Sequence, residues 1–170
     1  MKTYITALVS LILIVLLSTG TICAQEMSEH GAWGISAAIN GTETDIVFPI
    51  WIGNSTYLAP AVGLTSIGGA NTDISAVLIY HYYIDFDSHF SPFFGLRGGA
   101  VFGIPKGGTS TTDGLAGLSA GGEYFFNKHF SMGIEAQLNF TFSDKFSARF
   151  GNPGGTNINT ATLVYASIYF

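Results

Sequence analysis

The segment from Phe130 to Ser143 alternates between apolar residues and polar or small residues at every position. One parity reads Phe, Met, Ile, Ala, Leu, Phe, Phe, and the other reads Ser, Gly, Glu, Gln, Asn, Thr, Ser. Successive side chains of a β-strand point to opposite faces. The segment therefore predicts a strand with one oily face and one polar face, and it does not fit the spacing of an amphipathic helix.

The same alternation recurs along the chain. It is clear at 73–84, 90–104 and 116–126, and weaker at 31–40, 44–53, 57–67 and 160–170, which predicts eight strands in all. The connections alternate between tight turns, at 54–55, 85–87 and 127–129, and mostly longer polar loops, at 40–43, 68–72, 105–113 and 144–159. Turns at one rim and larger loops at the other are typical of an up-and-down antiparallel barrel. The predicted fold is all-β, an eight-stranded antiparallel barrel.

The N-terminus has the pattern of a secretory signal peptide. Lys2 precedes an apolar run at 7–17, which is shorter than the about 20 residues of a membrane-spanning helix. Ala24 supplies the small residue of a cleavage site. We expect residues 1–24 to be the signal peptide and residues 25–170 to be the barrel domain.

Cys23 is the single cysteine of the chain and lies in this leader. It raises the alternative of a lipoprotein, but the bulky Ile22 before it is unsuited to that processing site. Removal of the leader leaves a domain without cysteine, which excludes a disulfide, a thiolate nucleophile and a cysteine-based metal site there.

Charge indicates which face of the barrel is outside. Only 10% of the residues are charged, whereas soluble domains carry about 25%. A soluble lipocalin-like barrel is the alternative, and it would need charged side chains along its polar faces. These faces hold mainly Gly, Ser, Thr and Asn, which fit the interior of a narrow barrel. We therefore expect the oily faces to contact lipid, which makes the barrel transmembrane.

Aromatic residues on the oily faces cluster at two levels, as in the girdles of membrane barrels. One predicted group lies near the rim of tight turns: Tyr80, Tyr82, Phe86, Phe90, Phe94, Tyr124, Phe126, Phe130 and Phe170. The other lies near the loop rim: Phe102, Phe140, Phe142 and Phe146.

The leader, the stretch GLSAGGEYFFNKHFSMGIEAQLNFTFS at 117–143 and the ending TLVYASIYF at 162–170 together carry a family resemblance. The chain resembles the small eight-stranded outer-membrane barrels of the OmpA, OmpX and OmpW type. The resemblance implies location in the bacterial outer membrane. The alternate residues Phe170, Ile168, Ala166 and Val164 resemble the C-terminal signal that the barrel-assembly machinery reads.

Arg97, Glu123 and Glu135 fall on inward parities of neighbouring predicted strands. Because a lone charge inside a narrow barrel is costly, we expect Arg97 to pair with one or both glutamates and to plug the lumen. The resemblance leaves a second possibility, that this charge cluster acts as a gate. His81, inward near the turn rim, is interpreted as a polar interior histidine rather than a catalyst.

The predicted function is a structural one or the passive exchange of small solutes, without enzymatic activity, cofactor or metal. The expected partners are outer-membrane lipids, lipopolysaccharide and the barrel-assembly machinery. We expect a monomer. The acidic balance, six Lys and Arg against eleven Asp and Glu, gives no footprint for nucleic acid. A narrow transporter of small or apolar molecules, as in the OmpW-like branch, is the main alternative, followed by a surface adhesin.

A lipid A acyl hydrolase is a further alternative, because His129 and Ser131 have the spacing of the barrel deacylases that the chain resembles. Glu135 is too close in sequence to match that pattern, and His129 falls at the wrong rim. The loop 144–159 carries Lys145, Phe146, Arg149 and Phe150. We interpret it as a mobile solvated loop, with contact to lipopolysaccharide phosphates as the alternative.

Overall fold

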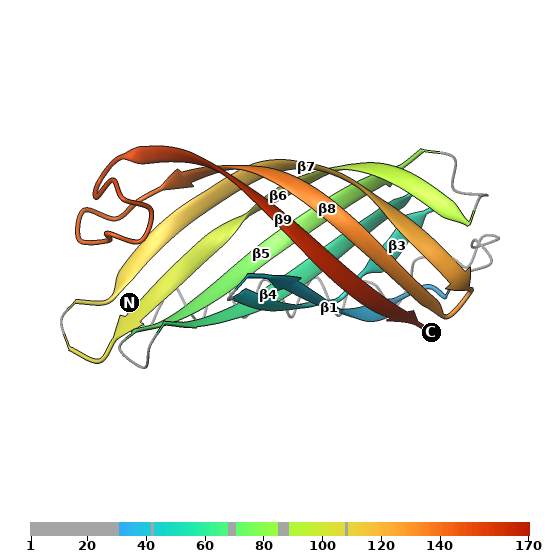
Figure 1. The fold of residues 1–170 in the computed structure, drawn as a ribbon, viewed down its shortest axis with the longest axis horizontal. Coiled ribbons are helices and arrows are strands. Elements are labelled where there is room, and N and C mark those ends of the chain that lie inside the picture. The colour runs from blue at the N-terminus through green and yellow to red at the C-terminus, as the bar shows by residue number, and fades with distance from the viewer. Residues whose placement is uncertain (1–30, 42, 68–70, 85–88, 108) are drawn as a thin grey trace.

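A computed structural model describes residues 31–41, 43–67, 71–84, 89–107 and 109–170. The predicted signal peptide at 1–24 and Phe86 of the predicted girdle lie outside these ranges. The strands are β1 (Gly34–Asn40), β2 (Glu43–Val47), β3 (Ile50–Gly53), β4 (Thr56–Ile67), β5 (Asn71–Tyr83), β6 (Phe90–Pro105), β7 (Thr111–Asn127), β8 (Phe130–Phe142) and β9 (Thr156–Tyr169) (Figure 1). Among the described residues, no helix is long and apolar enough to cross a membrane.

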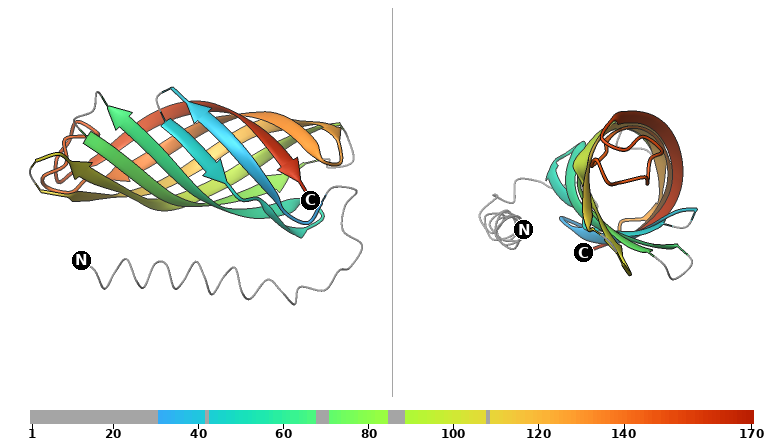
Figure 2. Two further views of the ribbon diagram at one scale, coloured as in Figure 1. Left: turned by 90° about the horizontal axis from the view of Figure 1, so that it is seen from below. Right: turned by 90° about the vertical axis from the view of Figure 1, so that its left-hand side faces the viewer.

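The strands form one antiparallel sheet in the order β2-β1-β9-β8-β7-β6-β5-β4-β3, and β2 also pairs with β4. That last pairing closes the sheet into a barrel, which is seen end-on as a ring in Figure 2. Because β2 and β3 follow each other along the same partner β4, they are two halves of one position in the wall. The predicted eight-stranded antiparallel barrel is therefore confirmed.

The predicted strand 44–53 is divided between β2 and β3 at Phe48 and Pro49. A proline has no N–H to donate to the ladder. The chain keeps its place in the wall through neighbouring groups: the Phe48 N–H donates to the Pro60 carbonyl at 2.9 Å, and the Gly34 N–H donates to the Pro49 carbonyl at 2.8 Å. The interruption is thus local and leaves the barrel closed.

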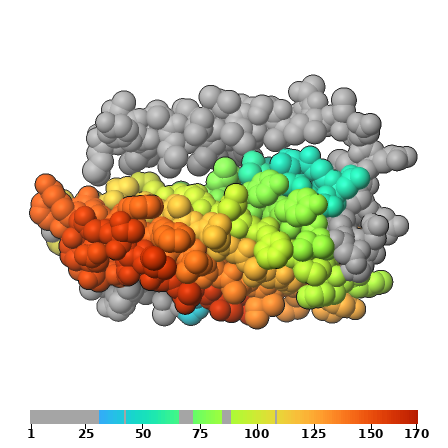
Figure 3. Space-filling model, turned by 90° about the horizontal axis from the view of Figure 1, so that it is seen from above, coloured from blue at the N-terminus to red at the C-terminus, as the bar shows by residue number. Residues whose placement is uncertain are grey.

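The outer face of the wall is apolar. Leu78, Leu96 and Ile134, from β5, β6 and β8, are 48%, 54% and 55% exposed, and each lies on the parity predicted to face lipid. Figure 3 shows the atoms of the coloured residues packed into a closed surface, with the segment around 144–155 at one end. Exposed apolar area of this extent needs a nonpolar environment.

The two strands β7 and β9 begin at Thr111 and Thr156, earlier than predicted, so the loops before them are shorter than predicted.

Glycines on the inner face make room for large interior side chains. A Cβ at Gly133 of β8 would lie 2.3 Å from Cζ of Tyr165, and a Cβ at Gly121 of β7 would lie 2.5 Å from Cζ of Phe93. Glycine is the residue that allows such close approach. Bulky interior side chains therefore lie against glycines, which lets side chains fill the narrow interior of the barrel.

Candidate functional site in the filled interior

The interior of the barrel contains three groups of side chains along its axis. We call them the turn-side plug, the central polar chain and the loop-side latch, and define each below by its residues. The turn rim carries the tight turns, and the loop rim carries the connections at 106–110 and 143–155.

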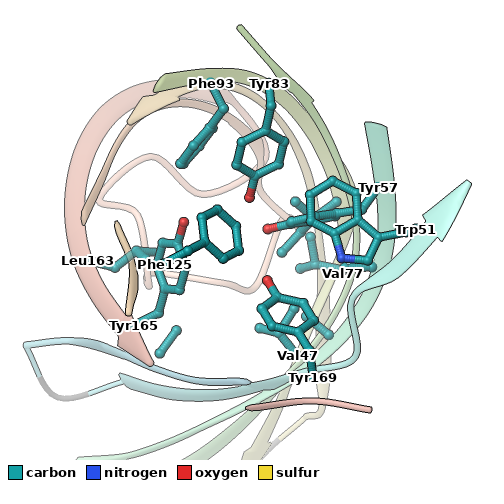
Figure 4. Close-up of a cluster of buried hydrophobic side chains, with 14 residues drawn as sticks. Val47, Trp51, Tyr57, Val77, Tyr83, Phe93, Phe125, Leu163, Tyr165 and Tyr169 are labelled. Atoms are coloured by element: carbon teal, nitrogen blue, oxygen red, sulfur yellow. The ribbon is translucent and has the colours of Figure 1, made fainter. Parts of the chain in front are cut away.

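The turn-side plug consists of aromatic residues from many strands. Its members are Trp51, Tyr57, Tyr83, Phe93, Phe125, Tyr165 and Tyr169, all at most 6% exposed. In Figure 4 the hydroxyl groups of Tyr57, Tyr83 and Tyr169 point toward the middle of the barrel, and the ring of Phe125 lies there too. Ring centroids of Trp51 and Tyr83 are 5.2 Å apart, and those of Phe125 and Tyr169 are 6.1 Å apart. These contacts fill this end of the lumen.

Glu123 is the charged centre of the turn-side plug and is fully buried. Its Oε2 accepts hydrogen bonds from the hydroxyls of Tyr83 and, at 3.1 Å, Tyr165. Its Oε1 accepts from the hydroxyls of Ser131 and, at 2.8 Å, Tyr169. An ionised carboxylate has about four acceptor positions, and four hydroxyl donors use them. Four hydroxyl groups therefore supply the hydrogen bonds to the Glu123 carboxylate. The sequence had predicted Arg97 as a partner of this carboxylate.

The central polar chain consists of Arg97, Gln137, Glu135 and His81. Arg97 Nη1 donates to Gln137 Oε1, and Gln137 Nε2 donates to Glu135 Oε1 at 2.9 Å. His81 Nε2 lies 3.3 Å from Glu135 Oε2, and its ring stacks on Phe93 with centroids 4.1 Å apart. His81 is 1% exposed, so it lies in the interior as expected for a lumen residue.

The predicted direct pairing of Arg97 with a glutamate is not what the structure has. In the described part of the chain, no carboxylate lies within salt-bridge distance of Arg97, and Gln137 stands between Arg97 and Glu135. The register gives the reason. Arg97 pairs with Gly117 on β7, six positions before Glu123 on that strand. Shared parity puts both side chains inside the barrel. The register puts them at different levels along the barrel axis.

The loop-side latch consists of Arg149 and the two aspartates that bind it, Asp73 and Asp113. The loop 143–155 directs Arg149 into the barrel mouth. Arg149 Nε and Nη2 donate to the two carboxylate oxygens of Asp73 at 2.8 and 2.6 Å. Arg149 Nη1 donates to Asp113 Oδ2 at 2.5 Å. Asp113 also accepts from the Ser147 hydroxyl at 2.7 Å and from the Asp144 N–H at 2.8 Å. A bidentate arginine fork and a fully buried aspartate thus fasten the loop to β5 and β7.

The loop itself is built from turns. The Ser147 N–H donates to the Asp144 carbonyl at 2.9 Å, and the Gly151 N–H donates to the Ala148 carbonyl at 3.0 Å. Gly151 and Gly154 have φ of 76° and 71°, which favours glycine. Figure 2 shows this segment lying across the opening of the ring. The segment therefore has a defined fold in which Arg149 is only 17% exposed, while Phe146 is 64% exposed to solvent. The mobility of the loop stays a prediction.

The residues considered for acyl hydrolysis lie in different places, one inside the barrel and one in the turn between β7 and β8. Ser131 is fully buried, and its hydroxyl donates to Glu123. His129 is exposed at the turn rim, and its Nδ1 lies 3.1 Å from the Tyr169 carbonyl oxygen. No hydrogen bond joins His129 to Ser131, both of which the structure describes. The arrangement lacks the base-to-nucleophile contact that a triad requires.

The predicted C-terminal signal lies on the outer face at the turn rim. Phe170, Ile168 and Val164 are 56%, 49% and 50% exposed, and Ala166 between them is partly exposed. The Phe170 ring stacks on Trp33 with centroids 4.7 Å apart. Within the described residues, no three His, Cys, Asp or Glu side chains are grouped so as to hold a metal ion.

Sequence reasoning did not identify the tyrosine donors around Glu123, the bridging Gln137 or the latch. Asp73 and Tyr83 did fall on the inward parity of 73–84. Parity could have placed them in the lumen, but it could not indicate which strands face each other across it. Parity gave no indication for Arg149, because this residue lies outside the alternating segments.

Comparison with known proteins identifies the fold. No family model and no curated protein matches the sequence. The crystal structure of Neisserial surface protein A (NspA) matches with a TM-score of 0.59 and 15% identity, over 81% of this chain and 93% of that one. The N-terminal β-barrel domain of Pseudomonas aeruginosa OprF matches with a TM-score of 0.51 and 14% identity, over 81% and 95%. The chain has the fold of the small eight-stranded outer-membrane β-barrels, as the sequence resemblance predicted.

Proposed function

We propose that this protein is a closed, non-enzymatic barrel of the bacterial outer membrane with a structural role in the envelope. The observation that carries the proposal is the filling of the lumen at three levels. The turn-side plug, the central polar chain and the loop-side latch occupy it with buried side chains that are bonded to one another. An eight-stranded barrel has an interior just wide enough for side chains to fill.

The outer face supports membrane insertion. Apolar side chains cover the wall, while a closed barrel leaves no free backbone edge in the hydrocarbon. Outer-membrane lipids and lipopolysaccharide are the partners that such a surface fits. The exposed alternate residues of the C-terminal strand, Phe170, Ile168, Ala166 and Val164, fit recognition by the barrel-assembly machinery. We propose that the protein is a monomer and that it uses no cofactor.

The absence of enzymatic activity is supported by the geometry at Ser131. Its hydroxyl is inside the plug and donates to a carboxylate, so that lipid outside the wall cannot reach it. We expect Ser131→Ala to leave the acylation of lipid A in the host membrane unchanged. Altered lipid A in that variant would contradict the proposal.

Planar-bilayer conductance tests the closed lumen. Protein that runs faster on a gel unheated than boiled is folded, and this fraction is inserted into bilayers at several salt concentrations. We expect no discrete channel events from it. Regular single-channel steps from the folded fraction would overturn the closed barrel and favour the narrow transporter.

A further inference from the structure

The two halves of the lumen differ in how tightly their inward-facing side chains are packed. On β9 the inward residues from Leu163 to Tyr169 are buried, whereas those from Asn157 to Ala161 are half-buried. The loop-side parts of β2, β6 and β7 also carry half-buried inward residues: Glu43, Asp45, Arg97, Val101 and Leu115. A half-buried side chain has surface that a water molecule can touch. The loop-side half of the lumen therefore contains space that water can reach.

This space is open toward the loop side. The pairing of β1 with β9 ends at Ile39 and Val164, while β9 continues to Thr156, so that β9 extends past the short β1–β2 hairpin (Figure 1). The wall is therefore lower at this hairpin than at β9. Toward the turn side the space meets the turn-side plug, whose aromatic residues are at most 6% exposed.

The inner end of the space carries polar atoms that lack a hydrogen-bond partner. Asn139 and Ser119 are each 6% exposed, and neither Asn139 Oδ1 nor Ser119 Oγ is hydrogen-bonded to a described residue. The same is true of the buried atoms Arg97 Nε and Asp45 Oδ1. Asn139 Oδ1 and Arg97 Cγ lie 2.6 and 3.0 Å from the Cβ position of Gly117, so they are neighbours. Buried polar atoms of this kind are commonly satisfied by internal water.

The charged side chains around the space carry an excess of negative charge. For Glu43 and Asp45, the described part of the chain supplies no basic group within salt-bridge distance. The remaining inward-facing charged groups here are the carboxylates of Asp73, Asp113 and Glu135 and the guanidinium groups of Arg97 and Arg149. A protonated His81 would not balance this excess. A narrow, water-filled space with such walls attracts cations and repels anions.

We propose that the loop-side half of the lumen is a blind, water-filled chamber that takes up small cations. Water bonded to Asn139, Ser119 and Arg97 lies at its inner end, and Glu43 and Asp45 provide its negative wall. Because no three His, Cys, Asp or Glu side chains of the described residues are grouped to hold an ion directly, the cation keeps its hydration shell. The proposal rests on the closed barrel proposed above at one point, which is the seal that the turn-side plug provides.

Single cysteines test the chamber, because Cys23 of the predicted leader is the only cysteine of the chain. In the leader-free protein, Leu115→Cys faces the chamber, and Ala116→Cys is the adjacent outward position on β7. Ser131→Cys is a change of similar size inside the fully buried plug. Each variant is folded in detergent micelles, which leave both rims open to reagents. Two methanethiosulfonates of similar size are applied, one bearing a trimethylammonium group and the other a sulfonate group.

Each rate is divided by the rate of the same reagent with 2-mercaptoethanol, which removes the difference in intrinsic reactivity. With the cationic reagent, we expect Leu115→Cys to react at least tenfold faster than Ala116→Cys and Ser131→Cys. For Leu115→Cys at low salt, the cationic reagent should react at least fivefold faster than the anionic one. This ratio should fall at least twofold at high salt, and also when Asp45→Asn is added.

Heat-modifiable gel mobility establishes that each variant is folded, and Val101→Cys takes the place of Leu115→Cys where the latter does not fold. Folded Leu115→Cys that reacts no faster than Ala116→Cys would overturn the chamber and leave the closed barrel standing. Equal normalised rates for the two reagents would overturn the uptake of cations. Ser131→Cys that reacts as fast as Leu115→Cys would show that the plug does not seal, which would contradict the closed barrel itself.

Discussion

Tyr169, at the end of β9, donates its hydroxyl to Glu123 of β7 across 2.8 Å, although β8 lies between these two strands in the wall. The hydrogen bond therefore crosses the lumen instead of following the sheet. Tyr83 on β5 and Tyr165 on β9 bond to the same carboxylate. Glu123 thus connects strands that the backbone ladder does not join directly.

Glu123→Gln should destabilise the barrel, because an amide nitrogen cannot accept the hydroxyl hydrogen bonds that the carboxylate oxygen accepts. We expect a loss of about 2–3 kcal/mol, in line with the cost of leaving buried donors unpaired. Urea unfolding in lipid vesicles, followed by tryptophan fluorescence, measures it. A free energy of unfolding within about 0.5 kcal/mol of wild type would show that the hydroxyl hydrogen bonds to Glu123 do not stabilise the barrel.

Tyr83 and Tyr82 are adjacent residues that face opposite sides of the wall, at 1% and 51% exposure. Tyr83→Phe removes one donor to Glu123 and should cost about 1–2 kcal/mol. Tyr82→Phe alters only the outer face and should stay within about 0.5 kcal/mol. The pair is measured by the same urea unfolding, and an equal effect of both changes would argue against the observed orientation of β5.

Gly133→Ala should strain the turn-side plug. The added Cβ would lie 2.4 Å from the Tyr165 hydroxyl oxygen, so Tyr165 must move away from Glu123. Overpacking of this kind costs about 1–3 kcal/mol. Gly53→Ala is the matched control, because nothing lies within 4 Å of its Cβ position. Thermal unfolding of the two variants, monitored by gel mobility, should separate them clearly, and equal melting would speak against the close contact.

Leu96→Arg should oppose membrane insertion. Leu96 is 54% exposed on the outer face of β6, and an arginine near the middle of the hydrocarbon costs about 2–4 kcal/mol. The control is Phe146→Arg in the loop, where Phe146 is 64% exposed and water is at hand. Folding yield into vesicles is the measurement. A Leu96→Arg variant that inserts as well as Phe146→Arg would mean that this face does not contact lipid.

The wall of the barrel could be predicted from sequence because strand parity is a local property. The alternation at 130–143 indicated which side chains of β8 face inward, and Glu135 and Gln137 are indeed buried. The partners of these residues could not be predicted in the same way. They depend on the register between strands and on contacts across the lumen, as the separation of Arg97 from Glu123 illustrates.

The loop-side latch could not be predicted for a different reason. Arg149 lies in a segment with Gly, Asn and Pro, whose composition indicates turns but not their direction. Asp73 and Asp113, two acidic residues at inward-facing positions, bind the guanidinium of Arg149 and so determine that the loop folds toward the lumen.

The contact between the apolar outer wall and lipid is tested most directly by refolding the leader-free protein from urea with and without phospholipid vesicles. We predict that vesicles yield a form that migrates faster unheated than boiled and that co-sediments with the lipid. Without lipid or detergent we predict aggregation. A soluble, monodisperse and folded protein in buffer alone would contradict a membrane-embedded barrel.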